Sequence, residues 1–145
     1  WYYMKYGEND KNATKLFKYE GTWYYVNKGI VDFNATTLVK HGNSWYYVNK
    51  GKVDFNARTL CKYNGVYYFV QNGKMDTKSV TLCKYGSSWY YIKNAKIDKT
   101  RTLCKYNGKW YYVNNGKVDF KYTGNVTYNG SVYYVKNGIM QKKVK

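Results

Sequence analysis

Three residue types recur together in this chain and could bind a ligand: a tryptophan, a tyrosine two residues after it, and a lysine five residues before it. In the stretch from Leu103 to Phe120 they are Trp110, Tyr112 and Lys105. The face of an aromatic ring attracts cations, and a lysine ammonium binds phosphate or carboxylate as a point charge. A flat ring beside an ammonium therefore suits a sugar ring that carries an anionic group.

This group is one copy of a repeat. Its tryptophan slot recurs at steps of 22 residues, with a single step of 21, and is filled by Trp1, Trp23, Trp45, Tyr67, Trp89, Trp110 and Val132. A fixed period of this kind indicates a repeat architecture. We expect residues 1–145 to form a single repeat domain of six to seven repeats. Because the chain begins within the motif, we also expect it to be a fragment of a larger secreted protein.

Four copies contain all three residue types. We predict that the ligand-binding residues are Trp23, Tyr25, Lys18, Trp45, Tyr47, Lys40, Trp89, Tyr91, Lys84, Trp110, Tyr112 and Lys105. The alternative is that the tryptophans pack against the next hairpin and the lysine stems lie over them.

Tight turns must position these residues. Asn107-Gly108 and Asn115-Gly116 each stand between strand-like runs, and Asn-Gly favours the type I′ turn of a two-residue hairpin. The first turn then places Lys105 opposite Trp110 and Leu103 opposite Tyr112. Each repeat is therefore two or three short strands, with no helical periodicity.

The register sorts the side chains onto two faces, since residues alternate along a strand. One face is apolar and is predicted to form the core, with Tyr24, Tyr46, Tyr68, Tyr90, Tyr111, Val26, Val48, Val70, Ile92 and Val113. The other face, with Leu103, Lys105, Trp110 and Tyr112, is predicted to be partly hydrated. One hairpin cannot bury its own apolar face, so the pattern predicts an all-β solenoid of stacked hairpins.

The composition favours some classes of function over others. The chain has 21 tyrosines, no proline and a net charge of +17, from 25 basic and 8 acidic residues. Such a surface attracts polyanions, and the sequence has no apolar run long enough for membrane insertion. Single-stranded nucleic acid also binds basic aromatic surfaces, but no nucleic-acid motif is present. One histidine and no nucleophile–base pair argue against an enzyme, and we expect no cofactor.

Two other positions of the repeat hold a recurring residue type. Asp10, Asp32, Asp54, Asp76, Asp98 and Asp119 share one of them, which indicates a turn or ion-pair residue or, alternatively, one calcium ligand per repeat. Cys61, Cys83 and Cys104 share an apolar slot that elsewhere holds Phe17, Val39 and Val126. This predicts buried structural thiols, the alternatives being an interchain disulfide or a zinc site.

The stretch Gly108-Lys109-Trp110-Tyr111-Tyr112-Val113 followed by Asn115-Gly116 resembles the bacterial cell-wall-binding repeat, a superfamily that includes choline-binding and glucan-binding repeats. The resemblance covers essentially the whole chain. It implies a left-handed superhelix of hairpins, secretion, attachment to a Gram-positive cell surface or a glucan, and no catalysis. The partner implied is a cell-wall polymer, teichoic acid or polysaccharide, with a structural or adhesive stalk that binds host glycans or presents another domain as the alternative.

The chain departs from the choline-binding pattern at one position. That pattern has a Gly-Trp pair seven residues before the Trp-Tyr-Tyr triplet, and its tryptophan helps to complete an aromatic cage for choline. Here the pair reads Thr37-Leu38, Thr59-Leu60, Thr81-Leu82 and Thr102-Leu103. A quaternary ammonium is held by several π faces at once. We therefore expect free choline to bind weakly or not at all.

Overall fold

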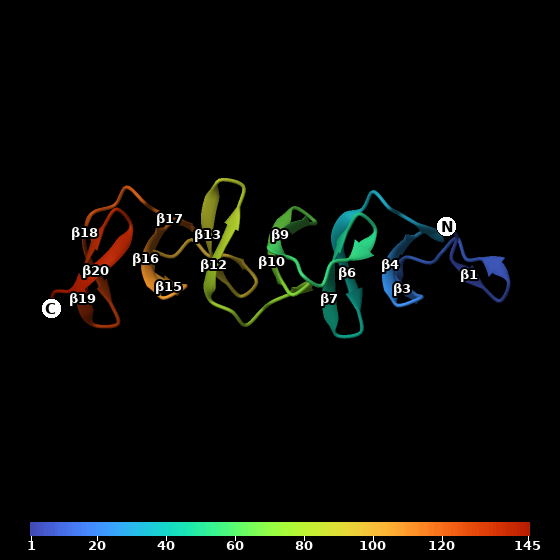
Figure 1. Ribbon diagram of the computed structural model, residues 1–145, viewed down its shortest axis with the longest axis horizontal. Coiled ribbons are helices and arrows are strands. Elements are labelled where there is room, and N and C mark those ends of the chain that lie inside the picture. Colours follow the sequence, from blue (N-terminus) through green and yellow to red (C-terminus); the bar gives the residue numbers. More distant parts are fainter. The chain divides into compact units, whose positions relative to one another are not determined.

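The computed structural model of the protein describes residues 1–145 and consists of β-strands joined by turns. The prediction of an all-β chain of hairpin repeats is confirmed. The chain divides into two compact units, Trp1–Asp76 and Thr77–Lys145, and within each unit the hairpins follow one another in chain order (Figure 1). The structure has no helix that could cross a membrane.

The first unit contains a short N-terminal pair of strands and three hairpins. Its strands are β1 Met4–Lys5, β2 Glu8–Asn9, β3 Lys15–Tyr19, β4 Thr22–Asn27, β5 Ile30–Val31, β6 Thr36–His41, β7 Ser44–Asn49, β8 Lys52–Val53, β9 Arg58–Tyr63, β10 Val66–Gln71 and β11 Lys74–Met75.

The second unit contains three further hairpins. Its strands are β12 Thr81–Tyr85, β13 Ser88–Lys93, β14 Lys96–Ile97, β15 Thr102–Tyr106, β16 Lys109–Asn114, β17 Lys117–Val118, β18 Gly124–Tyr128, β19 Ser131–Lys136 and β20 Ile139–Lys143.

The hairpin register agrees with the prediction. In β15–β16, Lys105 pairs with Trp110 and Leu103 with Tyr112. Asn107 and Gly108 both have positive φ, of 49° and 82°, as a type I′ turn requires. The hairpins at Gly42 and Gly86 differ, because only the glycine has positive φ there. These turns are of type II′, which places glycine at the first central position.

The short third strand of each repeat joins neighbouring hairpins. β8 pairs with β7 of its own hairpin and, through Lys52, with Tyr24 of β4 in the preceding hairpin. The N–H of Tyr25 also donates a 2.8 Å hydrogen bond to the carbonyl of Gly51. The turn that carries Gly51 is therefore held against the preceding repeat, and a Cβ at Gly51 would lie 2.6 Å from the Asp32 carbonyl oxygen.

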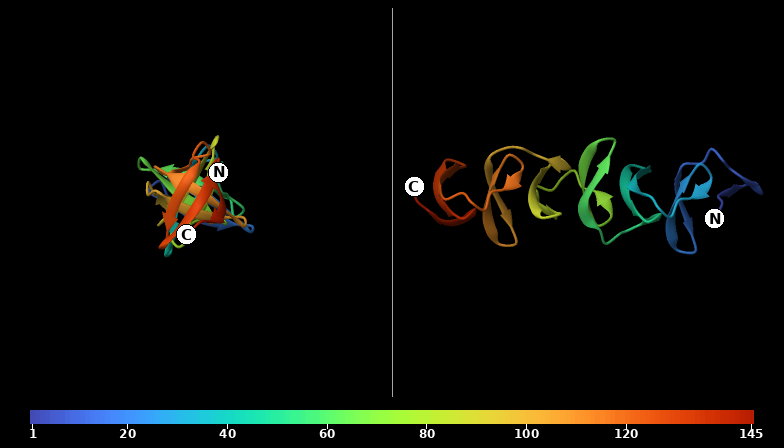
Figure 2. Two further views of the ribbon diagram at one scale, coloured as in Figure 1. Left: turned by 90° about the vertical axis from the view of Figure 1, so that its left-hand side faces the viewer. Right: turned by 90° about the horizontal axis from the view of Figure 1, so that it is seen from above.

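The core lies between successive hairpins. In the first unit Leu16 packs with Val39 and Val48 of the next hairpin, and in the second unit Leu103 packs with Val126 and Val135. Figure 2 shows that successive hairpins of one unit turn different faces to the viewer. Each inner hairpin is thus covered on one face by the hairpin before it and on the other by the hairpin after it.

This arrangement corrects the predicted division into a buried and a hydrated face. Leu103 and Tyr112, predicted on the hydrated face, are each 2% exposed. The aliphatic core residues, such as Val48 and Val113, are fully buried as predicted, but Tyr24, Tyr46, Tyr68, Tyr90 and Tyr111 are only half-buried. Stacking covers both faces of an inner hairpin, which buries Leu103 and Tyr112 as well. The middle tyrosines lie beside exposed phenylalanines, as Tyr111 does beside Phe120 at a centroid distance of 6.3 Å, and so stay partly exposed.

Candidate functional site

The tryptophan of each triplet lies beside an aromatic ring of the following hairpin. Ring centroids are 5.2 Å apart for Trp45 and Tyr63, and 5.3 Å apart for Trp110 and Tyr128, with interplanar angles of 56° and 57°. Trp89 and Tyr106 repeat this geometry at 5.2 Å and 57°. Each pair therefore presents two inclined rings at the junction of two hairpins.

The junction at Trp23 has a histidine in place of the tyrosine. Trp23 lies 4.9 Å from the ring of His41, and His41 in turn lies 6.2 Å from Tyr46. A hollow of about 260 Å³ opens here, and Trp23, His41, Tyr46 and Phe55 contribute aromatic walls while Lys74 adds a cation. The buried Leu16, which occupies the slot of the missing tryptophan, also lines it.

The predicted lysines lie across the hairpin from the tryptophans. Lys18 pairs with Trp23, Lys40 with Trp45, and Lys105 with Trp110. The Lys18 ammonium is 6.0 Å from the centre of the Trp23 ring. These lysines are exposed and the tryptophans are half-buried, so an anionic group can reach the ammonium while an apolar group contacts the ring.

The third residue of the triplet is placed differently from the prediction. Tyr91 and Tyr112 are buried in the inter-hairpin core, while Tyr25 and Tyr47 are half-buried. Burial raises the pKa of Tyr25 and of Tyr91, with a smaller contribution from nearby groups. The structure therefore brings each tryptophan and its lysine together, but it places the rings of Tyr91 and Tyr112 inside the fold.

Sequence reasoning missed the partner ring. Tyr63, Tyr106, Tyr128 and His41 each end the first strand of a hairpin. The signal was present, because Tyr19, His41, Tyr63, Tyr85, Tyr106 and Tyr128 fill one slot of the repeat. It was overlooked because the register within one hairpin does not show which residues of the next hairpin lie against it.

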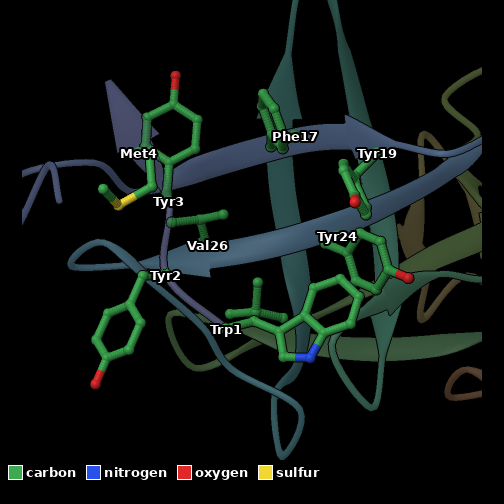
Figure 3. A pocket seen from close by; sticks show the side chains of 9 residues that line it. Trp1, Tyr2, Tyr3, Met4, Phe17, Tyr19, Tyr24 and Val26 are labelled. Carbon is green, nitrogen blue, oxygen red and sulfur yellow. The ribbon is translucent and has the colours of Figure 1, made fainter. Parts of the chain in front are cut away.

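A second aromatic hollow lies at the N-terminal end of the first unit (Figure 3). It measures about 460 Å³, and Trp1, Phe17, Tyr19 and Tyr24 line it together with other apolar or tyrosine side chains. Trp1 packs on Tyr24 with ring centroids 5.4 Å apart. Two of the rings that line it also lie near a cation, since the ammonium of Lys15 is 4.4 Å from the ring centre of Tyr3 and that of Lys52 is 5.8 Å from the ring centre of Tyr24.

The aspartates that recur in one slot of the repeat accept hydrogen bonds from the backbone. The Oδ1 atoms of Asp10, Asp32, Asp54, Asp98 and Asp119 each accept a hydrogen bond from the backbone N–H two residues on. This geometry is an Asx turn. The hydroxyl and N–H of Thr100 both donate to Asp98 and lower the pKa of that carboxyl. The interpretation of the slot as a turn residue is confirmed.

The cysteines are buried and free. Cys61, Cys83 and Cys104 each point their Sγ at the carbonyl of the following lysine, at 3.7 to 3.8 Å. Burial raises the pKa of Cys104 to about 11 and also raises that of Cys61. Their prediction as structural thiols of the core is confirmed.

A family model built on known proteins matches most of the chain. The model of the choline-binding repeat matches residues 16–32, 34–54, 58–76, 79–98, 100–119 and 121–141. No curated protein matches. Among solved structures, CbpJ from Streptococcus pneumoniae TIGR4 is 26% identical over 93% of this chain and 44% of its own, with a TM-score of 0.37.

Choline binding protein F from Streptococcus pneumoniae is 25% identical over 93% of this chain and 43% of its own, with a TM-score of 0.35. The same protein in complex with ipratropium is 24% identical over 93% of this chain and 44% of its own, with a TM-score of 0.36. The chain spans less than half the length of these structures. The repeat model matches well over half of the residues, and the chain therefore belongs to the choline-binding repeat family.

Proposed function

We propose that this chain is a non-catalytic module that attaches a secreted bacterial protein to the cell wall, with choline-bearing teichoic acid or a wall polysaccharide as its ligand. The observation that carries the proposal is the recurring junction in which a half-buried tryptophan, a ring of the next hairpin and an exposed cross-strand lysine stand together. Trp45, Tyr63 and Lys40 form one such junction. The site of action would be extracellular, on the cell surface.

The charge of the chain supports a polyanionic ligand. The net charge is +17, and the lysines opposite the tryptophans are exposed. A teichoic acid carries many phosphates along one polymer. Several weak junctions on one chain can engage it together, and linked weak sites gain affinity from effective concentration.

Choline itself is expected to contribute weakly at each junction. The slot of the missing tryptophan holds Leu16, Leu38, Leu82 and Leu103, which are 1–4% exposed. A buried leucine offers no π face to a quaternary ammonium. Two rings remain at the junction, the tryptophan and the ring of the next hairpin, so the polymer is expected to bind through choline and phosphate together.

Sedimentation with purified Gram-positive walls tests this proposal. The chain should sediment with native walls and stay in solution after teichoic acid has been extracted from them. A variant in which Trp23, Trp45, Trp89 and Trp110 are replaced by alanine should lose wall binding. The control is Tyr6→Ala, which removes a 95% exposed ring that belongs to none of the junctions. Equal binding to native and extracted walls would point to polysaccharide rather than teichoic acid.

One observation favours a second function, a structural or adhesive stalk. Both faces of the inner hairpins are used for packing, as Leu38 with Val70 and Leu103 with Val135 show. A chain whose repeats mainly bury one another can serve as a spacer that presents another domain. Binding to neither native nor extracted walls would favour this function.

A further inference from the structure

The guanidinium of Arg101 is held by two tyrosines in the second unit. Its Nε–H donates a 2.6 Å hydrogen bond to the hydroxyl oxygen of Tyr112, and its Cζ lies 5.5 Å from the centre of the Tyr112 ring and 5.8 Å from that of Tyr122. The two rings are stacked, 4.0 Å apart at 24°. The Tyr122 O–H donates to the carbonyl of Asn125 at 3.0 Å. The cation is therefore fixed in direction although it is exposed.

Two departures from the repeat meet at this place. Tyr122 occupies the slot that holds Ala13, Ala35 and Ala57 in other copies, each three residues after the turn aspartate. Arg101 stands two residues before the buried Leu103, and only one other copy, with Arg58 before Leu60, has arginine there. A ring and a guanidinium introduced side by side indicate a feature particular to the last junction of the chain.

The comparison with Arg58 shows what Arg101 lacks. The Nε–H of Arg58 donates to Oε1 of Gln71 at 3.0 Å, and Nε2 of Gln71 donates to Oδ2 of Asp76 at 3.1 Å. Arg58 is thus connected to a carboxylate through one amide. The groups that act on Arg101 are the two tyrosines, and no carboxylate is among them. The positive charge of this guanidinium is therefore not neutralised by a carboxylate, and its exposed side can be approached by an anion from solution.

The hollow next to Arg101 offers further donors. It measures about 290 Å³ and is lined by Arg101, Asn125, Val126 and Thr127. In the β18–β19 hairpin, Tyr128 and Ser131 flank the two-residue turn, so their backbone groups point toward each other. Backbone groups of successive residues point to opposite edges of a strand, so those of Val126 point toward its partner Tyr133. The N–H groups of Asn125 and Thr127 therefore point away from β19, toward the open edge of β18.

We propose that this hollow binds the phosphate group of a phosphate ester, with the Arg101 guanidinium as the charged fork and the outward N–H groups of Asn125 and Thr127 as additional donors. Arginine binds phosphate oxygens in a bidentate way, which a lysine cannot do. The inference goes beyond the proposed function, because it concerns an anion site that the tryptophan junctions do not include. The ester could belong to a polymer backbone, as a diester, or to a free monoester.

Nuclear magnetic resonance of the ¹⁵N-labelled chain tests this proposal directly. The probes are methyl phosphate, a monoester, and dimethyl phosphate, a diester, each titrated at constant ionic strength against sodium chloride. We expect saturable shifts of the Arg101 side-chain N–H and of the Asn125 and Thr127 backbone N–H signals. Saturation by dimethyl phosphate would assign the site to a polymer backbone, and saturation by methyl phosphate alone to a free monoester.

Arg101→Gln should weaken phosphate ester binding about tenfold or more, because it removes the charged fork. The matched control is Arg58→Gln, which removes one positive charge from the same slot and should change the affinity less than about twofold, since exposed charges at a distance are screened. Tyr122→Ala restores the residue found in other repeats and should also weaken binding, because the guanidinium loses one ring of its support.

Two results would contradict the proposed phosphate ester site. One is the absence of saturable shifts at Arg101, Asn125 and Thr127 with either probe. The other is equal weakening by Arg101→Gln and Arg58→Gln, which would show that only net charge matters. Neither result depends on choline or on the tryptophan junctions, so this test and the wall-binding test can fail separately.

Discussion

The indole of Trp110 lies 5.3 Å from the ring of Tyr128, a residue of the following hairpin. A ligand that contacts both rings therefore contacts two repeats. We expect Tyr128→Ala to abolish the same binding site as Trp110→Ala, and the double variant to lose no more than either single one. Calorimetric titration with teichoic acid counts the sites. If Tyr128→Ala leaves the number of sites unchanged while Trp110→Ala lowers it, the junction is not the binding unit.

The sequence was sufficient to predict the repeat, the turns and the register. Asn107-Gly108 requires positive φ at both residues and thereby fixes the pairing of Lys105 with Trp110. The burial of each face could not be predicted from one repeat, because it depends on the rotation between hairpins. Tyr112 was predicted to be partly hydrated, yet the following hairpin covers it with Val126 and Val135. Tyr128, the ring that lies beside Trp110, was missed for the same reason.

The buried leucines should contribute more to stability than the exposed aromatic residues. Leu103 is 2% exposed, whereas Phe120 is 47% exposed. We expect Leu103→Ala to lower the free energy of unfolding by about 3 kcal/mol, the typical cost of this truncation in a core. Phe120→Ala should cost less than about 1 kcal/mol. Urea unfolding followed by tryptophan fluorescence measures both values, and equal losses would contradict the assignment of the core.

The turn between β7 and β8 favours glycine at position 51 through a close contact as well as through its backbone conformation. Gly51 and Gly65 both have positive φ, but a Cβ at Gly51 would lie 2.6 Å from the Asp32 carbonyl oxygen and a Cβ at Gly65 would meet nothing within 4 Å. We expect Gly65→Ala to cost about 1–2 kcal/mol of unfolding free energy, the penalty of a left-handed backbone. Gly51→Ala should cost clearly more.

Thermal and urea unfolding of these two variants provides the test. The two glycines have almost the same φ, of 79° and 81°, so conformational strain cancels in the comparison. A larger loss at Gly51 measures the close approach of successive repeats. Indistinguishable losses would mean that the turn can move away from Asp32 without cost.

The buried thiols should make stability fall at high pH. Burial raises the pKa of Cys104 from 9.0 to about 11, so the folded state holds this proton more tightly than the unfolded state. The contribution of this thiol to the free energy of unfolding is fully present below pH 9 and is lost as the pH rises toward 11. Cys104→Val places the residue of other repeats in the slot and should reduce the fall in unfolding free energy over this range. An unchanged pH dependence would contradict the assignment.

The same burial predicts slow thiol chemistry, because the thiolate is the reactive form. At pH 8 the three cysteines of the folded chain should resist an aromatic disulfide reagent, and all three should react in urea. The absorbance of the released thiolate counts them. Rapid reaction of Cys104 in the folded chain would show that the junction between β12–β13 and β15–β16, where this thiol is buried, opens readily.

Titration of tryptophan fluorescence with purified choline-bearing teichoic acid, at low and at high salt, tests the proposed function most directly. Because exposed charges are screened within about 8 Å at physiological ionic strength, we predict that the polymer changes the fluorescence saturably and that its affinity falls as salt rises. Free choline should bind weakly or not at all. Tight, salt-insensitive binding of free choline would contradict the role assigned to the lysines and leucines, and no response to either ligand would contradict wall binding.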